Sequence, residues 1–272
     1  MKINYSQSNL QTFLTCPRKF ELKYILKRIW PAIQSEPVLQ LEEHIQNGKQ
    51  FHLMAQQYFS GLNPEQISLQ TENQTLLTWW KNFLNFSNQF SSMECKPEVY
   101  ISADLEGKRL VGIFDLLAYS SPGKFIINDW KTNNKKADKK TLRQQIQTRL
   151  YPFLLTLSGA QWNNNQSILP SQIEMVYWFA NEPENIDSFS YSEKQFREDK
   201  EFFINLIDTI ENKSPGEFEL TEKEKFCKFC QFRSLCNRGV SPGNLDDEIF
   251  DLDYFLEEIS EIDIDQIGEI AF

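Results

Sequence analysis

The sequence predicts an α/β fold, in which a mixed sheet is flanked by helices, preceded by a helical part and followed by a cysteine-containing segment. Three observations lead to this prediction. Apolar side chains recur at helical spacing through the first 90 residues. Residues 98–131 show the alternation of apolar and polar side chains that is typical of strands. After residue 138, helical and strand patterns alternate, as they do in α/β domains.

The N-terminal part contains three expected helices. The first spans residues 5–30, begins at the capping residue Ser6 and carries an apolar stripe, although Pro17 can divide it in two. The second spans residues 39–60 and is amphipathic. The third spans residues 72–90 and is rich in Trp and Phe.

Three strands, followed by a helix, a strand and a second helix, form the expected core. The first three strands are expected at residues 98–105, 109–119 and 124–131. Turn residues separate them at 106–107 and 121–123. The later elements are a helix at 139–158, a strand at 172–180 and a helix at 192–212.

The composition narrows the class of protein. Phe, Tyr and Trp make up 14% of the chain, which supports a sizeable core and excludes a mainly disordered protein. No apolar run approaches the roughly 18 residues that a membrane helix needs. The N-terminus lacks the apolar stretch of a secretory signal. We therefore expect a cytoplasmic protein that does not contact a membrane.

The net charge of −10 comes from the C-terminal end of the chain. No Lys or Arg follows Arg238, and residues 239–272 contain 11 acids, whereas residues 1–238 contain 28 bases and 27 acids. The body of the protein is therefore close to neutral, with local basic clusters. We expect one folded domain over residues 1–240 and an acidic tail over residues 241–272.

Three of the five cysteines form a compact group. An odd number of cysteines without a signal sequence argues against a disulfide framework. Cys227, Cys230 and Cys236 have the C-x2-C-x5-C spacing of metal ligands. Zinc or an iron–sulfur cluster usually takes four protein ligands, and we expect Cys16 rather than Cys95 as the fourth.

Two carboxylates are predicted to face each other across the hairpin of the second and third strands. Paired positions in a hairpin have a constant sum, and Asp115 and Asp129 sum to 244, which centres on Pro122 in the turn. Directly opposed Cβ atoms lie about 4.5–5.5 Å apart. Lys131 shares a strand face with Asp129, while Trp130 points to the other face.

Adjacent carboxylates repel each other unless a cation lies between them. Their oxygens suit Mg²⁺ or Mn²⁺, and the ammonium group of Lys131 could orient a water and offset charge on a phosphorane. This combination is typical of metal-dependent phosphodiester hydrolysis. A surface cluster of salt bridges is the alternative interpretation, because Asp-x-Lys is a common sequence.

The order of these residues resembles the RecB-like branch of the PD-(D/E)XK nuclease superfamily. The matching segments are Gly112-x-x-Asp115, Asp129-x-Lys131-Thr132, Gln147-x-x-x-Tyr151, Gly48-x-x-x-His52 and the opening residues 5–20. The resemblance covers residues 3–240 and implies a restriction-endonuclease-like core.

The resemblance implies a metal site. Asp115 and Asp129 would bind Mg²⁺ or Mn²⁺, with His52 and the carbonyl of Trp130 as further ligands. Glu98 occupies a place where relatives often carry an acid, and a solvated strand end is the alternative interpretation of this residue.

The resemblance also implies a deoxyribonuclease that acts on DNA ends or single strands. Lys131 would position the attacking water, and Gln147 and Tyr151 would hold the catalytic site and the nucleic acid strand. Basic residues that follow this site could track DNA phosphates, unless they form only a solvated face. They are Lys135, Lys136, Lys139, Lys140, Arg143 and Arg149.

The cysteines match the iron–sulfur members of the RecB-like branch, and this resemblance assigns a [4Fe–4S] cluster to Cys16, Cys227, Cys230 and Cys236. Zinc is the chemical alternative, because four thiolates suit it as well. Such domains occur in AddB recombination nucleases and in CRISPR-associated RecB-type exonucleases, which implies a helicase or a CRISPR-adaptation protein as a partner. The alternative function is a non-catalytic module that binds nucleic acid or a partner in a helicase–nuclease assembly.

Overall fold

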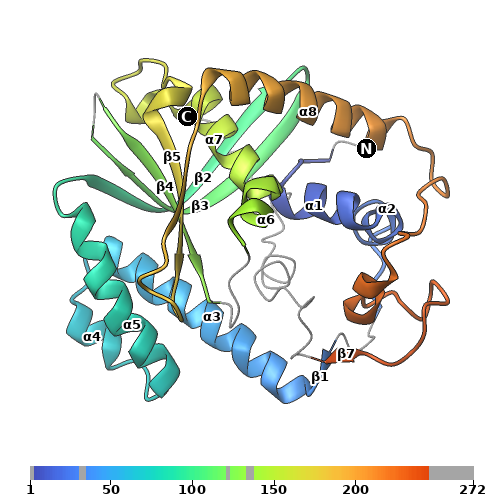
Figure 1. The fold of residues 1–272 in the computed structure, drawn as a ribbon, viewed down its shortest axis with the longest axis horizontal. Coiled ribbons are helices and arrows are strands. Elements are labelled where there is room, and N and C mark those ends of the chain that lie inside the picture. The colour runs from blue at the N-terminus through green and yellow to red at the C-terminus, as the bar shows by residue number, and fades with distance from the viewer. Residues whose placement is uncertain (1–2, 31–34, 121–122, 133–137, 245–272) are drawn as a thin grey trace.

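A five-stranded mixed sheet forms the centre of the computed structural model of the chain, which describes residues 3–30, 35–120, 123–132 and 138–244 (Figure 1). Helices cover both faces of this sheet, so the predicted α/β class is confirmed. The predicted acidic tail lies outside the described residues from residue 245 onwards. In the described segments, no helix is both long and apolar enough to cross a membrane.

The sheet combines antiparallel and parallel neighbours in the order β2-β3-β4-β5-β6. The strands are β2 (Glu94–Leu105), β3 (Lys108–Tyr119), β4 (Phe125–Lys131), β5 (Ile173–Phe179) and β6 (Asp187–Ser190). Strands β4 and β5 are parallel, and the other neighbours are antiparallel. A parallel pair needs a long crossover, which here contains α6 (Lys139–Gln144) and α7 (Ile146–Ser158). The crossover therefore carries α7 back across one face of the sheet.

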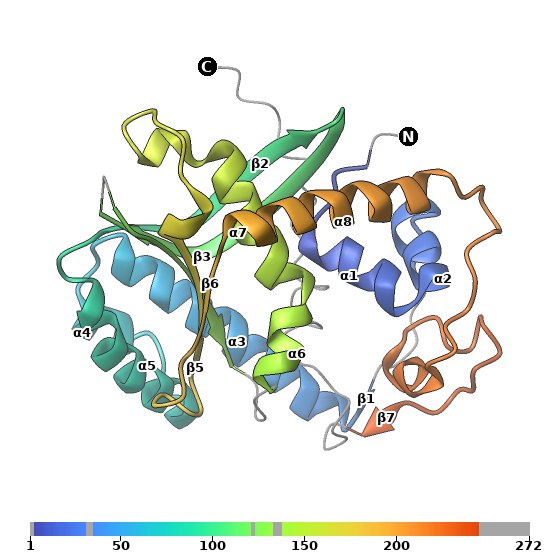
Figure 2. The same ribbon diagram turned by 45° about the horizontal axis from the view of Figure 1, so that its top comes forward.

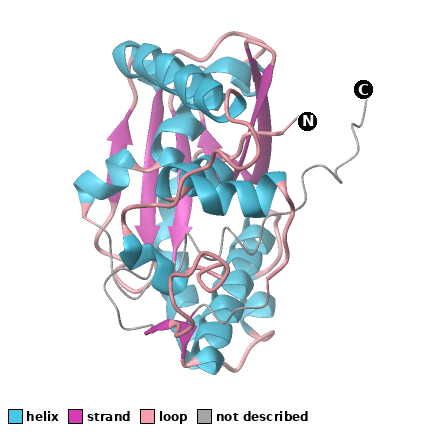
Figure 3. Cartoon of the chain, turned by 90° about the vertical axis from the view of Figure 1, so that its right-hand side faces the viewer, coloured by secondary structure: helices cyan, strands magenta, loops and turns pink. Residues whose placement is uncertain are grey.

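Different parts of the chain cover the two faces of the sheet (Figure 2). Helices α7 and α8 (Glu193–Glu211) pack on one face, together with α1 (Gln7–Thr15) and α2 (Pro17–Phe20). The other face is covered by α3 (Val38–Phe59), α4 (Pro64–Ser68) and α5 (Gln74–Ser87). Apart from the main sheet, β1 (Ser35–Glu36) and β7 (Gly243–Asn244) form a short parallel pair (Figure 3). This pair joins the end of the described chain to the segment just before α3.

Several element boundaries differ from the predicted ones. The helix expected over residues 5–30 ends at Thr15, because Cys16 is extended before Pro17 and caps α2 instead. The helix expected over 139–158 is broken at the extended Gln145. Strand β6 was not predicted, since its four residues are too few to give a clear period. The remaining short elements are a π-helical turn (Glu21–Ile25) and 3₁₀ turns at Asn88–Phe90, Gly159–Trp162, Pro170–Gln172 and Glu224–Phe229.

Aromatic rings fill the space between the sheet and the α3–α5 layer. Phe83 of α5 is fully buried, and the ring centroids of Trp80 and Trp130 lie 5.4 and 5.3 Å from its own. Successive side chains of a strand point to opposite faces. Because Trp130 stands between Asp129 and Lys131 in β4, this packing supports the strand from the face opposite to the two charged side chains.

Replacing Phe83 with alanine is expected to destabilise the protein strongly. The Phe83→Ala variant leaves a cavity among large rings, and such changes cost about 3–5 kcal/mol of unfolding free energy. Urea denaturation measures this loss. The control is Leu69→Ala, whose side chain is 84% exposed and whose loss should change stability by about 0.5 kcal/mol or less. Equal losses in the two variants would contradict the assignment of this core.

Candidate active site

Three acidic residues lie in one row across three neighbouring strands. The β3–β4 ladder keeps the predicted register, in which paired residue numbers sum to 244, as far as Leu116 and Asn128. One more step in this register would bring Asp115 opposite Asp129, but the backbone pairing ends at Leu116 and Asn128. The β2–β3 register, followed in the same way, places Glu98 opposite Asp115. Asp115 is therefore the middle carboxylate of the row.

The regular strand pattern changes at this row. Phe114 and Leu117 pack on the α7 side of the sheet, whereas Leu116 packs on the α3–α5 side, so the alternation along β3 shifts by one residue at Asp115. In β2, Glu98 has a φ of 49°, a left-handed backbone that residues other than glycine seldom adopt. Such strained positions are concentrated at functional sites. The irregular backbone thus coincides with the acidic row.

The Asp115 carboxylate uses its two oxygens for different partners. Its Oδ2 accepts a hydrogen bond of 2.7 Å from the backbone N–H of Trp130, so the side chain continues the pairing where the β3–β4 ladder stops. Its Oδ1 lies 3.3 Å from Nδ1 of His52, which projects from α3. Potential ligand atoms of His52, Glu98 and Asp115 all lie within 4.8 Å of one another. These three residues therefore have the spacing of a metal site.

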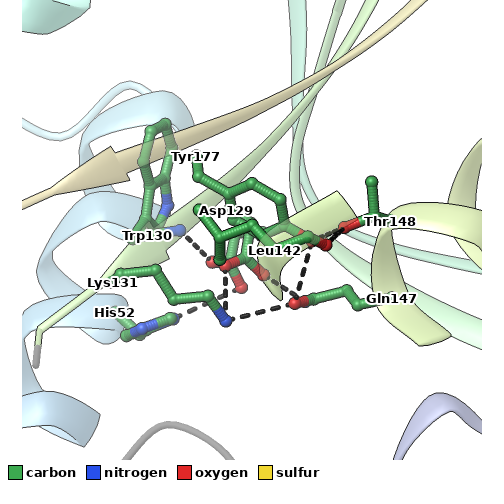
Figure 4. A network of polar contacts seen from close by, with 9 residues as sticks. His52, Asp129, Trp130, Lys131, Leu142, Gln147, Thr148 and Tyr177 are labelled. Carbon is green, nitrogen blue, oxygen red and sulfur yellow. Dashed lines mark hydrogen bonds and ion pairs between the residues drawn. The ribbon is translucent and has the colours of Figure 1, made fainter. Parts of the chain in front are cut away.

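A buried polar network extends from the row and consists of Asp129, Lys131 and Gln147 (Figure 4). Nζ of Lys131 lies 2.9 Å from Oδ2 of Asp129 and donates a hydrogen bond of 3.1 Å to Oε1 of Gln147. Nε2 of Gln147 donates to Oδ1 of Asp129. The hydroxyl group of Tyr177 also donates to Oε1 of Gln147, at 3.4 Å. The Gln147 amide therefore links the carboxylate and the ammonium group and fixes both.

Tyr151 lies one helical turn after Gln147 but packs on β3, whereas Gln147 contacts Asp129 and Lys131 of β4. Its ring centroid is 4.9 Å from that of Phe114, and a Cβ atom added to Gly112 would lie 3.2 Å from its Cε1. Gly112 thus allows α7 to approach β3 closely. The described contacts of Tyr151 with this strand hold α7 in the position from which Gln147 reaches the acidic residues.

The electrostatics of the row favour a bound cation. Burial, followed by the charge of Asp115, raises the pKa of Glu98 to about 7. Burial also raises the pKa of Asp129 to about 6, although Lys131 opposes this shift. Burial alone would lower the pKa of His52, but the carboxylate of Asp115 outweighs it and raises the value to about 9. With pKa values of about 7 and 6, the carboxyl groups of Glu98 and Asp129 therefore keep their protons to higher pH than ordinary carboxyl groups do in the absence of a metal ion.

The predicted DNA-tracking residues have different environments. Lys135 and Lys136 lie outside the described residues. Lys139, Lys140 and Arg143 are exposed on α6, and Lys139 and Arg143 lie 5.4 and 5.5 Å from the centroid of the Phe189 ring. Arg149 is different, because it pairs with Asp199 and stacks 3.6 Å from the centroid of the Phe202 ring. Its guanidinium group therefore joins α7 to α8.

The four predicted cluster cysteines line one cavity between α2 and the C-terminal segment, and they are Cys16, Cys227, Cys230 and Cys236. Burial and then the neighbouring cysteines raise the pKa of Cys227 to about 11. Around this cavity the N- and C-terminal parts are in direct contact, because the N–H of Arg18 donates to the carbonyl of Glu219 at 3.0 Å. Cys95 lies elsewhere, in β2.

Glu98 is the residue of this site that the sequence analysis left undecided between two interpretations. The same constant-sum rule could have placed it. The turn at residues 106–107 predicts a sum of 213 for the first hairpin, and that sum pairs Glu98 with Asp115.

Comparisons with known proteins identify a family. The model of the PD-(D/E)XK nuclease superfamily matches residues 4–237. Among solved structures, the chain is similar to SSO0001, with 16% identity, a TM-score of 0.41 and coverage of 86% of this chain and 85% of that one. It is also similar to a protein from Eubacterium rectale described as a "Putative exonuclease", with 10% identity, a TM-score of 0.47 and coverage of 95% and 93%. No curated protein matches the chain.

Removing the charge of Glu98 is expected to stabilise the metal-free protein at high pH. The pKa of Glu98 rises from 4.5 to about 7, so the folded protein binds this proton more tightly than the unfolded chain does. The carboxylate therefore destabilises the fold above pH 7, and this effect disappears as the pH falls towards 4.5. At pH 8 in EDTA, Glu98→Gln should gain about 1–2 kcal/mol.

The melting temperature at pH 8 and pH 5 measures this effect. The gain should be present at pH 8 and should shrink at pH 5. Glu184→Gln is the matched control. Because Glu184 is exposed, its replacement should change the melting temperature neither at pH 8 nor at pH 5. A Glu98→Gln variant that melts below the wild type at pH 8 would contradict the crowding of these carboxylates.

Proposed function

The chain belongs to the PD-(D/E)XK nuclease superfamily, and on this basis we propose that it is a metal-dependent deoxyribonuclease that acts on DNA ends or single strands. The observation that carries the proposal is the row of three carboxylates beside a buried lysine. The row offers ligands for a cation, and the lysine offers a positive charge to the reacting phosphate. A nuclease of this kind hydrolyses phosphodiester bonds with water as the nucleophile.

The acidic row fits Mg²⁺ or Mn²⁺ chemically. Both ions prefer oxygen ligands, and Asp115 and Asp129 would supply them, with His52 and the Trp130 carbonyl as further ligands. Oδ2 of Asp129 is buried and accepts no hydrogen bond from the described residues, although Lys131 lies near it. Glu98 is added to this set on the basis of its distance from His52 and Asp115. When bound, the ion would supply a Lewis acid that stabilises negative charge on the phosphate.

Lys131 has two roles in the proposed reaction. Its side chain is only 6% exposed, and Asp129 and Gln147 hold its ammonium group from two sides. An ammonium group fixed in this way can orient the attacking water by hydrogen bonding. It also opposes the negative charge that develops on the phosphate oxygens. Gln147 is a positioning residue in this scheme, because it acts through Lys131 and Asp129.

DNA would approach along the exposed basic surface of α6. Lys139, Lys140 and Arg143 follow the end of β4 and lie on the crossover that leads to Gln147. Lys135 and Lys136 are part of the same proposed path by their place in the sequence. Exposed lysines and arginines bind phosphates without reading the base sequence. This surface would thus supply affinity rather than sequence preference. Arg149 is a weaker member of the path, since Asp199 already holds it.

A non-catalytic binding module is the alternative function. Burying carboxylates close to one another costs free energy, and a module that only binds DNA has no need of that arrangement. The row and its lysine therefore favour catalysis.

Cleavage of labelled DNA tests the proposed function. Single- and double-stranded substrates should be cut with Mg²⁺ or Mn²⁺ and left intact in EDTA. Asp129→Asn should abolish cleavage because it removes a metal-binding charge. Lys131→Ala should keep metal binding and DNA affinity while losing most of the rate.

Lys108→Ala is the matched control for the lysine variant. Lys108 also pairs with carboxylates, those of Asp208 and Glu211, but at the β3–α8 contact rather than in the acidic row. This variant should cut DNA at the wild-type rate. Wild-type cleavage by Lys131→Ala would show that the assigned role of this lysine is wrong.

We also propose that Cys16, Cys227, Cys230 and Cys236 hold a [4Fe–4S] cluster with a structural role. The four cysteines line one cavity, as a shared metal centre requires. The choice of a cluster over a single zinc ion rests on the resemblance of their spacing in the sequence to the iron–sulfur members of the RecB-like branch. The cluster would join α2 to the C-terminal segment.

The cysteine ligands can be tested by comparing two variants. Residues 16 and 227 are far apart in sequence, and closing a loop of that length accounts for roughly 4–5 kcal/mol of denatured-state entropy. Cys16→Ser should therefore lose the iron and lower the melting temperature. Cys95→Ser should change neither, because Cys95 lies in β2. Iron loss in Cys95→Ser, together with retention in Cys16→Ser, would overturn the proposed ligand set.

A further inference from the structure

Arg233 is a buried cation beside the four cysteines. It stands in the segment between Cys230 and Cys236, and only 3% of its surface is exposed. The cavity that the four cysteines line is also lined by Arg233. The guanidinium group of arginine stays protonated in proteins, so burial cannot neutralise this charge by removing a proton.

The hydrogen bonds of Arg233 all go to neutral groups. Its Nε and Nη2 donate to the carbonyl of Val240 at 3.3 and 3.2 Å, and its Nη1 donates to the carbonyl of Cys230 at 3.1 Å. Within the described segments, no carboxylate forms an ion pair with it. Burying a charge without an opposite charge is costly. The part of the chain that the structure describes therefore offers Arg233 no anion, and the cavity is the place where one would fit.

A neighbouring arginine provides a contrast. Arg238 lines the same cavity, but it forms an ion pair with Glu224 and donates to the carbonyl of Thr221. Its charge is therefore already balanced by a carboxylate. Of the two arginines at this cavity, Arg238 is therefore neutralised by a carboxylate of the described residues, and Arg233 is not.

We propose that Arg233 is the counter-cation of an anionic metal centre held by the four cysteines, and that it raises the reduction potential of this centre. The inference rests on the cluster assigned above. Four thiolates around an oxidised [4Fe–4S] core with a charge of 2+ leave a net charge of 2−, and one added electron makes it 3−. A nearby positive charge stabilises the reduced form more than the oxidised form. Reduction adds one electron, which dithionite supplies in the titration described below, and no bond of the centre is made or broken.

The alternative role for Arg233 is a purely structural one, in which two of its hydrogen bonds tie the loop to Val240 and the third holds the carbonyl of Cys230. Replacing Arg233 with lysine distinguishes the charge role from the structural role. Arg233→Lys keeps the charge but cannot reproduce the planar set of three donors. Arg233→Met keeps much of the side-chain volume and removes both the charge and the donors. If the charge of Arg233 is what matters, Arg233→Lys keeps its function and Arg233→Met loses it. If the hydrogen bonds are what matter, both variants lose it.

The experiment compares the full-length wild type with Arg233→Lys, Arg233→Met and Arg238→Met, all purified without oxygen. Iron and sulfide per chain give the cluster content, and titration with dithionite, followed by visible absorbance and electron paramagnetic resonance, gives the midpoint potential. Arg233→Met should shift the potential to more negative values and hold less iron. Arg233→Lys should stay close to the wild type. Arg238→Met should shift the potential less than Arg233→Met, because Glu224 already balances that charge.

Each outcome decides the proposal. Equal potentials in the wild type and Arg233→Met would overturn it, and so would loss of iron in both Arg233 variants, which indicates a structural role. Loss of iron in Arg233→Met alone, with retention in Arg233→Lys, supports it. A wild-type protein without iron and sulfide would overturn both the cluster and this inference. The cleavage assay is independent of these measurements, so failure here would leave the proposed nuclease activity standing.

Discussion

The mutual repulsion of three carboxylates is the constraint on which the rest of the candidate site depends. Glu98, Asp115 and Asp129 stand on three neighbouring strands, and burial and the charge of Asp115 raise the pKa of each of the other two carboxyl groups. The groups around the row reduce its negative potential. Asp115 contacts His52 and the N–H of Trp130, and Asp129 contacts Lys131. A divalent cation would complete this neutralisation and convert a destabilising row into a ligand set.

The two cores of the protein hold the row in place from opposite sides. On one face, the close approach of α7 to β3 at Gly112 lets Gln147 reach Asp129 and Lys131. On the other face, Trp130 is fixed by the rings of the α5 layer. The charged residues before and after Trp130 therefore stand on a strand that cannot rotate. Catalytic groups need this kind of support, because a small displacement of a reacting group lowers the rate steeply.

Local spacing explains what could be predicted from the sequence. The register of β3 and β4 followed from the sum of residue numbers as far as Leu116 and Asn128, because a tight hairpin turn fixes the register of both strands. The same rule predicts the position of Glu98 opposite Asp115, but nothing in the sequence indicates the left-handed backbone at Glu98. The pairing of Arg149 with Asp199 could not be foreseen, since the two residues lie on helices whose contact is set by tertiary packing. Similarly, no sequence rule shows that Arg233 is buried while Arg238 pairs with Glu224.

The location of a bound Mn²⁺ ion tests most directly whether the acidic row is a cation site. Anomalous diffraction from crystals of the protein grown with Mn²⁺ would place the ion without reference to activity. We expect an anomalous peak in contact with the carboxylates of Asp115 and Asp129, and within reach of His52 and Glu98. A well-ordered crystal with no peak at the row, in which Asp129 still contacts Lys131 and Gln147, would contradict the assignment of a cation site.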